Sequence, residues 1–183
     1  MKALVETCLN ADGLWLSYGS VDAVKGVSVE VRANEVVALL GSNGSGKTTL
    51  LKGLCGAHRP KAGKVSVCGR DVDSLTSTER ARTVGFVPQS EEHAFDFTVR
   101  ELALMGRYAW SSGLFETEHD LAVVERAMTD ADCLQFAERR VSTLSGGEAQ
   151  RALIARALAQ QAPVLLCDEP NTHLCLLYTS RCV

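Results

Sequence analysis

The stretch that decides the fold spans residues 41–48 and reads Gly41-Ser42-Asn43-Gly44-Ser45-Gly46-Lys47-Thr48. It fits the pattern G-x-x-x-x-G-K-[ST], in which glycines let backbone N–H groups surround phosphates at a helix N-terminus. The apolar run at 36–40 predicts a buried strand before it, and a helix is expected that begins at about Lys47 and ends near Gly53 to Gly56. Lys47 would then reach the β- and γ-phosphates, while the Thr48 hydroxyl would coordinate Mg²⁺. The alternative is a tight strand-to-helix turn with a solvated lysine, but the flanking strand and helix favour nucleotide binding.

Composition limits the class of protein. The chain has 183 residues, 46% of them hydrophobic and 22% charged, which is ordinary for a single soluble domain. A formal net charge of −3 gives no electrostatic footprint for nucleic acid, and Arg139 with Arg140 fits a solvated helix face. No apolar run reaches the roughly 20 residues of a membrane span, and the N-terminus does not lead into a secretory apolar core, so a cytosolic chain is expected. The 7 cysteines contain no C-x-x-C pair and are odd in number, which argues against zinc and a complete disulfide framework.

The N-terminal part is predicted to be rich in β-structure. Residues 3–31 carry strand formers, with a turn at Tyr18-Gly19-Ser20 and strict alternation over 27–31. Tyr18 is either an aromatic that stacks on an adenine ring or an ordinary packed or surface aromatic, and the residues alone leave both open. Further strands are expected at 63–69 and 84–87, with a short helix between them at 76–82.

A helical insertion is predicted from about residue 90. Thr98 and Thr117 each begin a capping signal that precedes an apolar helical pattern, and residues 111–113 suit a loop between the two helices. The expected buried faces are formed by Leu102, Met105 and Tyr108 in the first helix and by Leu121, Val124, Ala127 and Met128 in the second. The apolar run from Val164 to Cys167, between Pro163 and Pro170, then predicts a buried parallel strand.

Polar side chains follow two of these strands. Asp168 and Glu169 come directly after the apolar run, and Gln89 follows the strand at 84–87. A hydrated Mg²⁺ that bridges phosphates needs an acidic partner such as Asp168, and Glu169 could polarise the attacking water as general base. Gln89 could orient water or contact the metal. The alternative for the carboxylates is a solvated acidic turn, which a phosphate loop upstream makes the weaker interpretation.

A second candidate phosphate site lies at 144–158, which begins Leu144-Ser145-Gly146-Gly147-Glu148. As local structure it predicts a capping box from Ser145 to Glu148 that opens an amphipathic helix. The capping box does not explain two consecutive glycines, which expose N–H groups beside the positive end of the helix dipole. One γ-phosphate does not need two such sites from one chain. We therefore expect two chains to enclose each nucleotide.

In order and content these motifs resemble the ATP-binding subunit of ATP-binding cassette (ABC) transporters, over roughly residues 3–174. The phosphate loop matches Walker A, Gln89 the Q-loop, residues 144–148 the signature, and 165–168 with Glu169 Walker B. The resemblance implies a P-loop NTPase (RecA-like) α/β core with an N-terminal antiparallel β subdomain and a helical subdomain insertion at about 90–145. It also implies ATP and Mg²⁺ at a head-to-tail dimer interface, catalysis by Glu169 and Gln89, and metal coordination by Thr48, Gln89 and Asp168. The implied nucleotide contacts are Tyr18, Gly41, Ser42, Asn43, Gly44, Ser45, Gly46, Lys47, Thr48, Thr49, Ser145, Gly146, Gly147 and Glu148.

A finer resemblance points to importers of iron–siderophore, haem or cobalamin. It rests on the stretches at 97–101, 105–108 and 155–160. The implied partners are a second ATP-binding subunit, integral permease subunits and, indirectly, a periplasmic or extracellular binding protein, with the chain on the cytoplasmic face of the membrane and no nucleic-acid partner. Two alternatives stay open: a soluble ABC ATPase without a transport role, and a nucleotide-binding fragment without turnover.

The end of the sequence departs from the family pattern. Residues 171–174 resemble the start of the D-loop, but Cys175 stands where the family usually has Asp, and 176–183 match nothing expected. We therefore expect a domain at 1–174, a non-native tail at 175–183, and a fragment that lacks the C-terminal part of the core with its switch histidine. Such a fragment is expected to hydrolyse ATP poorly or not at all.

Overall fold

The computed structural model describes residues 7–89, 96–111 and 116–169. The chain divides between Val84 and Gly85 into two compact units, called here the N-terminal and C-terminal units. Within these described ranges, no helix combines the length and apolar character needed to cross a bilayer. The predicted tail at 175–183 and the residues matched to the D-loop lie outside the described residues.

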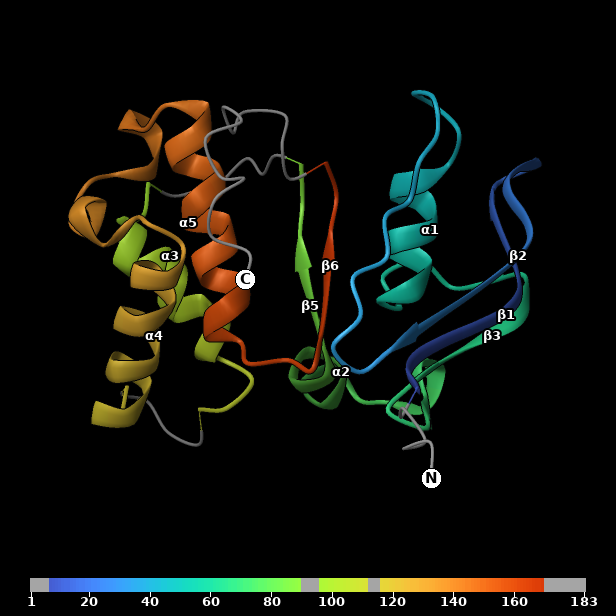
Figure 1. Ribbon diagram of the computed structural model, residues 1–183, viewed down its shortest axis with the longest axis horizontal. Coiled ribbons are helices and arrows are strands. Elements are labelled where there is room, and N and C mark those ends of the chain that lie inside the picture. The colour runs from blue at the N-terminus through green and yellow to red at the C-terminus, as the bar shows by residue number, and fades with distance from the viewer. Residues whose placement is uncertain (1–6, 90–95, 112–115, 170–183) are drawn as a thin grey trace. The chain divides into compact units, whose positions relative to one another are not determined.

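The N-terminal unit is built on an antiparallel sheet with the strand order β2-β1-β3-β4 (Figure 1). Its strands are β1 (Thr7–Tyr18), β2 (Val21–Arg32), β3 (Ala62–Val67) and β4 (Arg70–Asp71). The pair Tyr18↔Val21 closes the β1–β2 hairpin and confirms the predicted turn. Gly13, at φ 55°, lies where the register shifts between Ala11 and Leu14, so β1 is one irregular strand.

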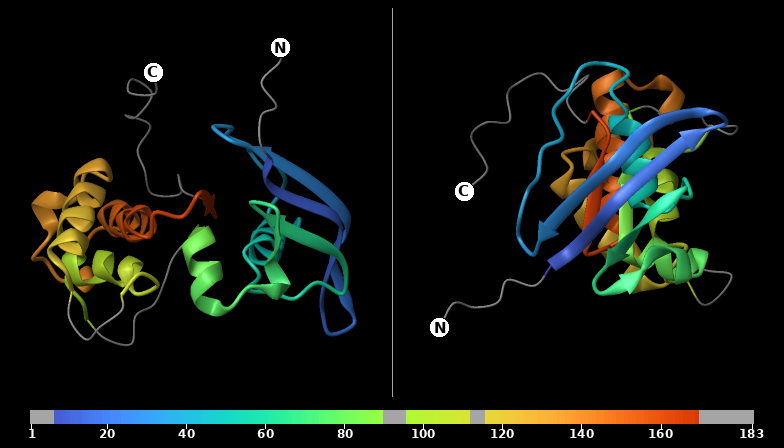
Figure 2. Two further views of the ribbon diagram at one scale, coloured as in Figure 1. Left: turned by 90° about the horizontal axis from the view of Figure 1, so that it is seen from below. Right: turned by 90° about the vertical axis from the view of Figure 1, so that its right-hand side faces the viewer.

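Helix α1 (Lys47–Leu54) packs on one face of this sheet (Figure 2). At Gly53 the approach is so close that an added Cβ would lie 2.5 Å from Cδ1 of Leu16. Leu14 and Leu16 of β1 are fully buried in this contact region. The unit ends with a 3₁₀ turn η1 (Val72–Ser74) and with α2 (Ser77–Thr83), the short helix predicted at 76–82.

The strand predicted at 36–40 is not formed. Residues 35–40 have no regular secondary structure, and Val36 and Leu40 are 97% and 92% exposed. A strand needs a hydrogen-bonded neighbour, and among the described strands none pairs with this segment. The segment therefore has the composition of a strand but lacks the neighbouring strand that would fix its backbone.

Strand β5 (Val84–Val87), which begins at the last residue of the N-terminal unit, forms a two-stranded sheet with β6 (Val164–Cys167) of the C-terminal unit. They run in the same direction (Figure 1), and the Asp168 N–H donates to the Val87 carbonyl at 2.9 Å where both end. Both strands were predicted. Full burial of the second was not correct, because Leu165 is 42% exposed while Val164 and Leu166 are buried.

The rest of this unit is helical. It contains α3 (Val99–Leu104), η2 (Met105–Arg107), α4 (Glu118–Asp130), η3 (Leu134–Phe136), η4 (Val141–Thr143) and α5 (Gly146–Ala159). Its core includes Leu102 of α3, Val124 and Met128 of α4, and Ala152 of α5. The capping boxes predicted at Thr98, Thr117 and Ser145 are all present, because each pattern carries its own local partner three residues on.

Two of the residues expected in the core are exposed instead. Tyr108 is exposed because α3 ends at Leu104 and the 3₁₀ turn after it rotates the chain away from the buried face. Leu121 is exposed because Asp120 takes the buried position one turn before Val124. Asp120 is compensated there by Arg107, whose Nε donates to Oδ1 at 2.8 Å.

Candidate functional site

The phosphate loop leads into α1 through a glycine that no other residue could replace without strain. Gly46 is the N-cap of α1 and has φ 92° and ψ 10°, in the left-handed region. A Cβ at this position would lie 2.7 Å from the carbonyl oxygen of Ala23 in β2. The loop is thereby fixed against the sheet of the N-terminal unit, and α1 begins at once with Lys47.

Lys47 turns its side chain back into the loop. Its ammonium donates to the carbonyls of Gly41 at 2.9 Å and Ser42 at 3.0 Å. The loop backbone also closes on itself, since Ser45 N–H donates to the Ser42 carbonyl at 3.2 Å. A mostly exposed loop curled around a cation at the start of a helix is suited to bind phosphate. The hydroxyls of Thr48 and Thr49 lie in the first turn of the same helix.

Tyr18 lies at the same end of the N-terminal unit. It ends β1, is 52% exposed, and pairs with Val21 of β2. Gly46 contacts the same strand at Ala23, two residues further on. Because a strand rises about 3.3 Å per residue, the positions on β2 that lie beside Tyr18 and beside Gly46 are roughly 7 Å apart. The structure thus brings together the predicted adenine contact and the phosphate loop.

The C-terminal unit brings together the predicted catalytic side chains. Gln89 Nε2 donates to Glu169 Oε2 at 2.8 Å, beyond the ends of β5 and β6. Asp168 is only 4% exposed, and its backbone is held by Val87. Glu169 has φ 47°, a conformation uncommon outside glycine and often found at functional sites. The amide of Gln89 thus orients the Glu169 carboxylate, and a general base has to be held in position in this way.

Gln150 connects this cluster to α5 and was missed in the sequence. It is buried, and its Nε2 donates to the carbonyl of Pro88 at 3.4 Å, immediately before Gln89. A buried glutamine must find partners, so a polar residue on the core face of α5 was the available signal. Gln150 thus connects the signature helix to the residue before Gln89.

The signature segment forms the expected helix cap. The Ser145 hydroxyl donates to Glu148 Oε2 at 2.9 Å and accepts the Glu148 N–H at 3.4 Å, and the Ser145 N–H donates to Oε2 at 2.7 Å. Gly146 and Gly147 form the first turn of α5, where helix geometry leaves N–H groups without an intrahelical acceptor. The loop therefore has N–H donors at Gly146 and Gly147, whereas the donors of Ser145 already bind the Glu148 carboxylate.

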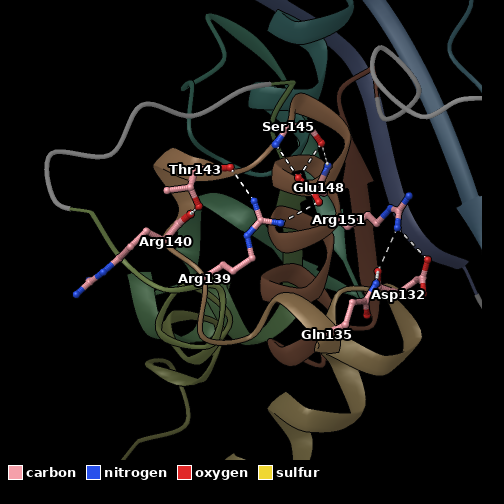
Figure 3. Close-up of polar contacts among 8 residues, drawn as sticks. All are labelled: Asp132, Gln135, Arg139, Arg140, Thr143, Ser145, Glu148 and Arg151. Atoms are coloured by element: carbon pink, nitrogen blue, oxygen red, sulfur yellow. Dashed lines mark hydrogen bonds and ion pairs between the residues drawn. The ribbon is translucent and has the colours of Figure 1, made fainter.

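Arg139 holds this loop, which corrects its interpretation as part of a solvated helix face. Its Nη2 donates to the Thr143 carbonyl at 2.8 Å and its Nη1 to Glu148 Oε1 at 3.1 Å (Figure 3). The guanidinium also lies 5.3 Å from the centre of the Phe136 ring. Its neighbour Arg140 instead donates to the Asp96 carbonyl. Sequence spacing gave no signal for these contacts, because residues 139–145 follow no helical period.

The pKa of Glu148 is lowered by its surroundings. The largest cause is the backbone N–H of Ser145, followed by the Ser145 hydroxyl, and Arg139 adds a smaller contribution. A second ion pair on α5, Arg151 Nη1 to Asp132 Oδ2 at 2.9 Å, does not involve Glu148 (Figure 3). The signature loop thus carries a charged carboxylate with an adjacent guanidinium.

The predicted metal ligands belong to different units. Thr48 is in the N-terminal unit, whereas Gln89 and Asp168 are in the C-terminal unit. Over the ranges that the structure describes, no group of three or more His, Cys, Asp and Glu side chains is placed to hold a metal ion.

Comparison with known proteins decides the family. The family whose sequence model matches this chain is described as ABC transporter, and the match covers residues 24–172. The chain belongs to the ABC transporter family. The match includes the phosphate loop, Gln89, the signature segment and Glu169, whereas Tyr18 precedes it.

Similar ABC proteins include named import ATPases. A cobalamin import ATP-binding protein, BtuD, of Halobacterium salinarum is 45% identical over 166 residues, which make up 91% of this chain and 42% of that protein. A hemin import ATP-binding protein, HmuV, of Streptomyces coelicolor is 44% identical over 169 residues, or 92% of this chain and 60% of that protein. The chain therefore spans about half the length of these relatives.

Solved structures confirm the predicted fold class. A metal-chelate type ABC transporter in an inward-facing conformation matches with a TM-score of 0.77 and 32% identity, covering 93% of this chain and 63% of that one. An ATP-bound bacterial exporter of the Atm1 family matches with a TM-score of 0.77 and 30% identity, covering 95% of this chain and 31% of that one. The fold is that of a P-loop NTPase of the ABC type, with an antiparallel β part and a helical part.

Proposed function

We propose that this chain is the ATP-binding part of a transport ATPase that hydrolyses ATP to drive import. The observation that carries the proposal is the phosphate loop, in which Gly46 starts α1 and Lys47 directs its ammonium to the loop carbonyls. Oxygens of a bound phosphate would replace the loop carbonyls as acceptors for this ammonium and would also accept hydrogen bonds from the N–H groups of the loop. Tyr18, at the same end of the unit, would stack on the adenine.

The hydrolytic step is assigned to the Gln89–Glu169 pair. The Glu169 carboxylate would accept a proton from the attacking water, and the amide of Gln89 would orient that carboxylate or the water. The hydroxyl of Thr48 and the carboxylate of Asp168 are oxygen donors of the kind Mg²⁺ prefers, with Gln89 as a further candidate. Mg²⁺, when bound, would neutralise charge that develops on the phosphates.

We assign the signature segment to a second copy of the chain. Its donors lie on α5 of the C-terminal unit, apart from the phosphate loop in sequence and in unit. In a head-to-tail dimer, Ser145, Gly146, Gly147 and Glu148 of one copy would face the phosphate loop of the other. Each copy would then complete the site of its partner, as symmetric association allows.

The import role and its cargo rest on the relatives. Those relatives are named for import of cobalamin and hemin, and a further one, FpuD of Bacillus anthracis, is named for import of petrobactin. We infer a cargo of the iron–siderophore, haem or cobalamin class, permease subunits as membrane partners, and a position on the cytoplasmic face of the membrane. A periplasmic or extracellular binding protein would take part only indirectly.

Experiments can distinguish this function from two others, a soluble ABC ATPase without a transport role and a nucleotide-binding chain without turnover. Co-purification with an integral permease would support transport over a soluble ABC ATPase. ATP binding without turnover would identify a nucleotide-binding chain, an alternative favoured by the partial span of the relatives. The test is calorimetric titration with Mg·ATP together with steady-state phosphate release, using Lys47→Ala as the inactive control. The proposal predicts ATP binding that Lys47→Ala weakens strongly, and absence of ATP binding by the wild-type chain would contradict it.

A further inference from the structure

We propose that His58 is a positioning residue for the nucleoside end of this site, because it holds the Tyr18 ring in place for an adenine. The inference rests on the proposed ATP-binding function. It adds a residue from the loop after α1, which none of the sequence motifs includes.

The two rings are in direct contact. The Tyr18 and His58 ring centroids lie 4.6 Å apart, with an angle of 44° between the ring planes. This separation falls within the range of favourable aromatic pairs. Tyr18 nevertheless remains 52% exposed, so His58 covers part of the ring and leaves the rest open. A tyrosine with one side supported and the other exposed is suited to receive a base.

The imidazole is itself fixed by a hydrogen bond. His58 Nε2 lies 3.0 Å from the carbonyl oxygen of Ser17, the residue before Tyr18. A carbonyl oxygen only accepts, so Nε2 carries the proton and donates. His58 thus contacts both the ring of Tyr18 and the backbone beside it, which restricts where that ring can lie.

His58 also connects the nucleoside end to the phosphate end. Its backbone N–H donates to the carbonyl of Lys52 at 3.0 Å, and Lys52 lies in α1, the helix that the phosphate loop begins. Tyr18, His58 and α1 therefore form one connected path within the N-terminal unit. Pre-ordering of Tyr18 along this path would lower the entropy that ATP binding has to overcome.

The loop around His58 is held by contacts other than its imidazole. Lys61 N–H donates to the Trp15 carbonyl at 2.8 Å, and Lys61 Nζ lies 3.5 Å from Asp22 Oδ1. Asp22 Oδ1 also accepts from the Ser17 hydroxyl at 2.6 Å. Since these contacts keep the loop along the β1–β2 hairpin, removal of the imidazole should leave the unit folded.

The test compares two ligands that share the phosphates but not the base. ATP and inorganic tripolyphosphate are titrated calorimetrically into the full 183-residue chain and its His58→Ala variant. Stacking contributes about five- to 150-fold per base, and we expect loss of its support to weaken ATP binding by about three- to tenfold. Tripolyphosphate affinity should not change. His119→Ala, at an exposed histidine of α4, is the matched control and should bind both ligands normally.

A double-variant cycle with Tyr18→Ala separates positioning from a direct contact. If His58 acts through Tyr18, His58→Ala has no further effect on ATP affinity once Tyr18 is removed. His58→Phe retains a ring against Tyr18 but loses the hydrogen bond to Ser17, so its ATP affinity should lie between those of His58→Ala and the wild type. An ATP affinity no higher than that of His58→Ala, in a variant with a native circular dichroism spectrum, would overturn the inference.

Other results would also overturn it. They are unchanged ATP affinity in His58→Ala, an equal loss for tripolyphosphate, and a full additional loss in the Tyr18→Ala background. Failure of the wild-type chain to bind either ligand would instead contradict the proposed function, so the two failures are distinguishable.

Discussion

The phosphate loop and the signature loop both lead into helices, but the first surrounds a positively charged side chain and the second a negatively charged one. At the phosphate loop, the Lys47 ammonium lies on the carbonyls of Gly41 and Ser42. At the signature loop, the Glu148 carboxylate takes the N–H and the hydroxyl of Ser145. The phosphate loop therefore presents a positive charge to an incoming anion. In the signature loop, the donors of Ser145 already bind the carboxylate of Glu148.

This difference suggests how the two loops share one task. The phosphate loop has what it needs to bind a polyanion within one chain. In the signature loop, Arg139 lies beside Glu148 and offsets a negative charge that would otherwise repel phosphate. We therefore expect the first loop to set ATP affinity, and the second to act once a partner copy presents bound nucleotide to it.

The largest effect is expected at Lys47. Lys47→Ala removes a charged donor whose hydrogen bonds are worth about 1.5–3 kcal/mol, or about ten- to 150-fold in ATP affinity. Lys52→Ala, at an exposed lysine in the last turn of the same helix, is the control and should change affinity by less than about twofold. Calorimetric titration measures both. Equal losses in the two variants would mean that general positive charge, not the loop geometry, binds ATP.

A smaller effect on stability is expected at Gly46. Gly46→Ala combines a left-handed backbone with a Cβ placed 2.7 Å from the Ala23 carbonyl, and should lower the free energy of unfolding by about 2 kcal/mol. Gly44→Ala is the matched control, because Gly44 has φ 79° but nothing within 4 Å of an added Cβ. It should cost about 1 kcal/mol, from backbone strain alone. Urea unfolding measures the difference, and equal losses would show that the contact with β2 does not constrain the loop.

The smallest effect is expected in the titration of Glu148. Its folded pKa lies below the ordinary value of 4.5, so its stabilising contribution is complete above that value and is lost as the pH falls through the folded pKa. Arg139→Met should raise this pKa while leaving it below 4.5, because the largest cause is the Ser145 N–H. Carbon-detected NMR follows the carboxyl directly. Arg151→Met, which breaks only the Asp132 pair, should leave the Glu148 titration unchanged, and a shift there would show that the effect is not local.

The features that the sequence predicted are those that neighbouring residues determine. The capping boxes at Thr98, Thr117 and Ser145 need only a partner three residues on, and α1 follows from the phosphate loop itself. Such local patterns predicted correctly where these helices begin, and they predicted the turn at Tyr18.

The features that were missed depend on residues distant in the sequence. The run at 36–40 has the composition of a strand, but no strand in the described part of the chain pairs with it. Asp120 is buried in place of Leu121 and forms an ion pair with Arg107 from another element. Arg139 lies before η4 and contacts Glu148 in the first turn of α5. Gln89 and Glu169, far apart in sequence, were both identified as candidates, but their hydrogen bond to each other required the β5–β6 pair.

The most direct test of the contrast between the loops is ATP titration of Ser145→Ala at concentrations where the chain sediments as a monomer. If the signature loop acts only on nucleotide bound by a second copy, the variant binds ATP within about twofold of the wild-type affinity. A loss as large as that of Lys47→Ala would contradict the account, because it would place both loops on one nucleotide within a single chain.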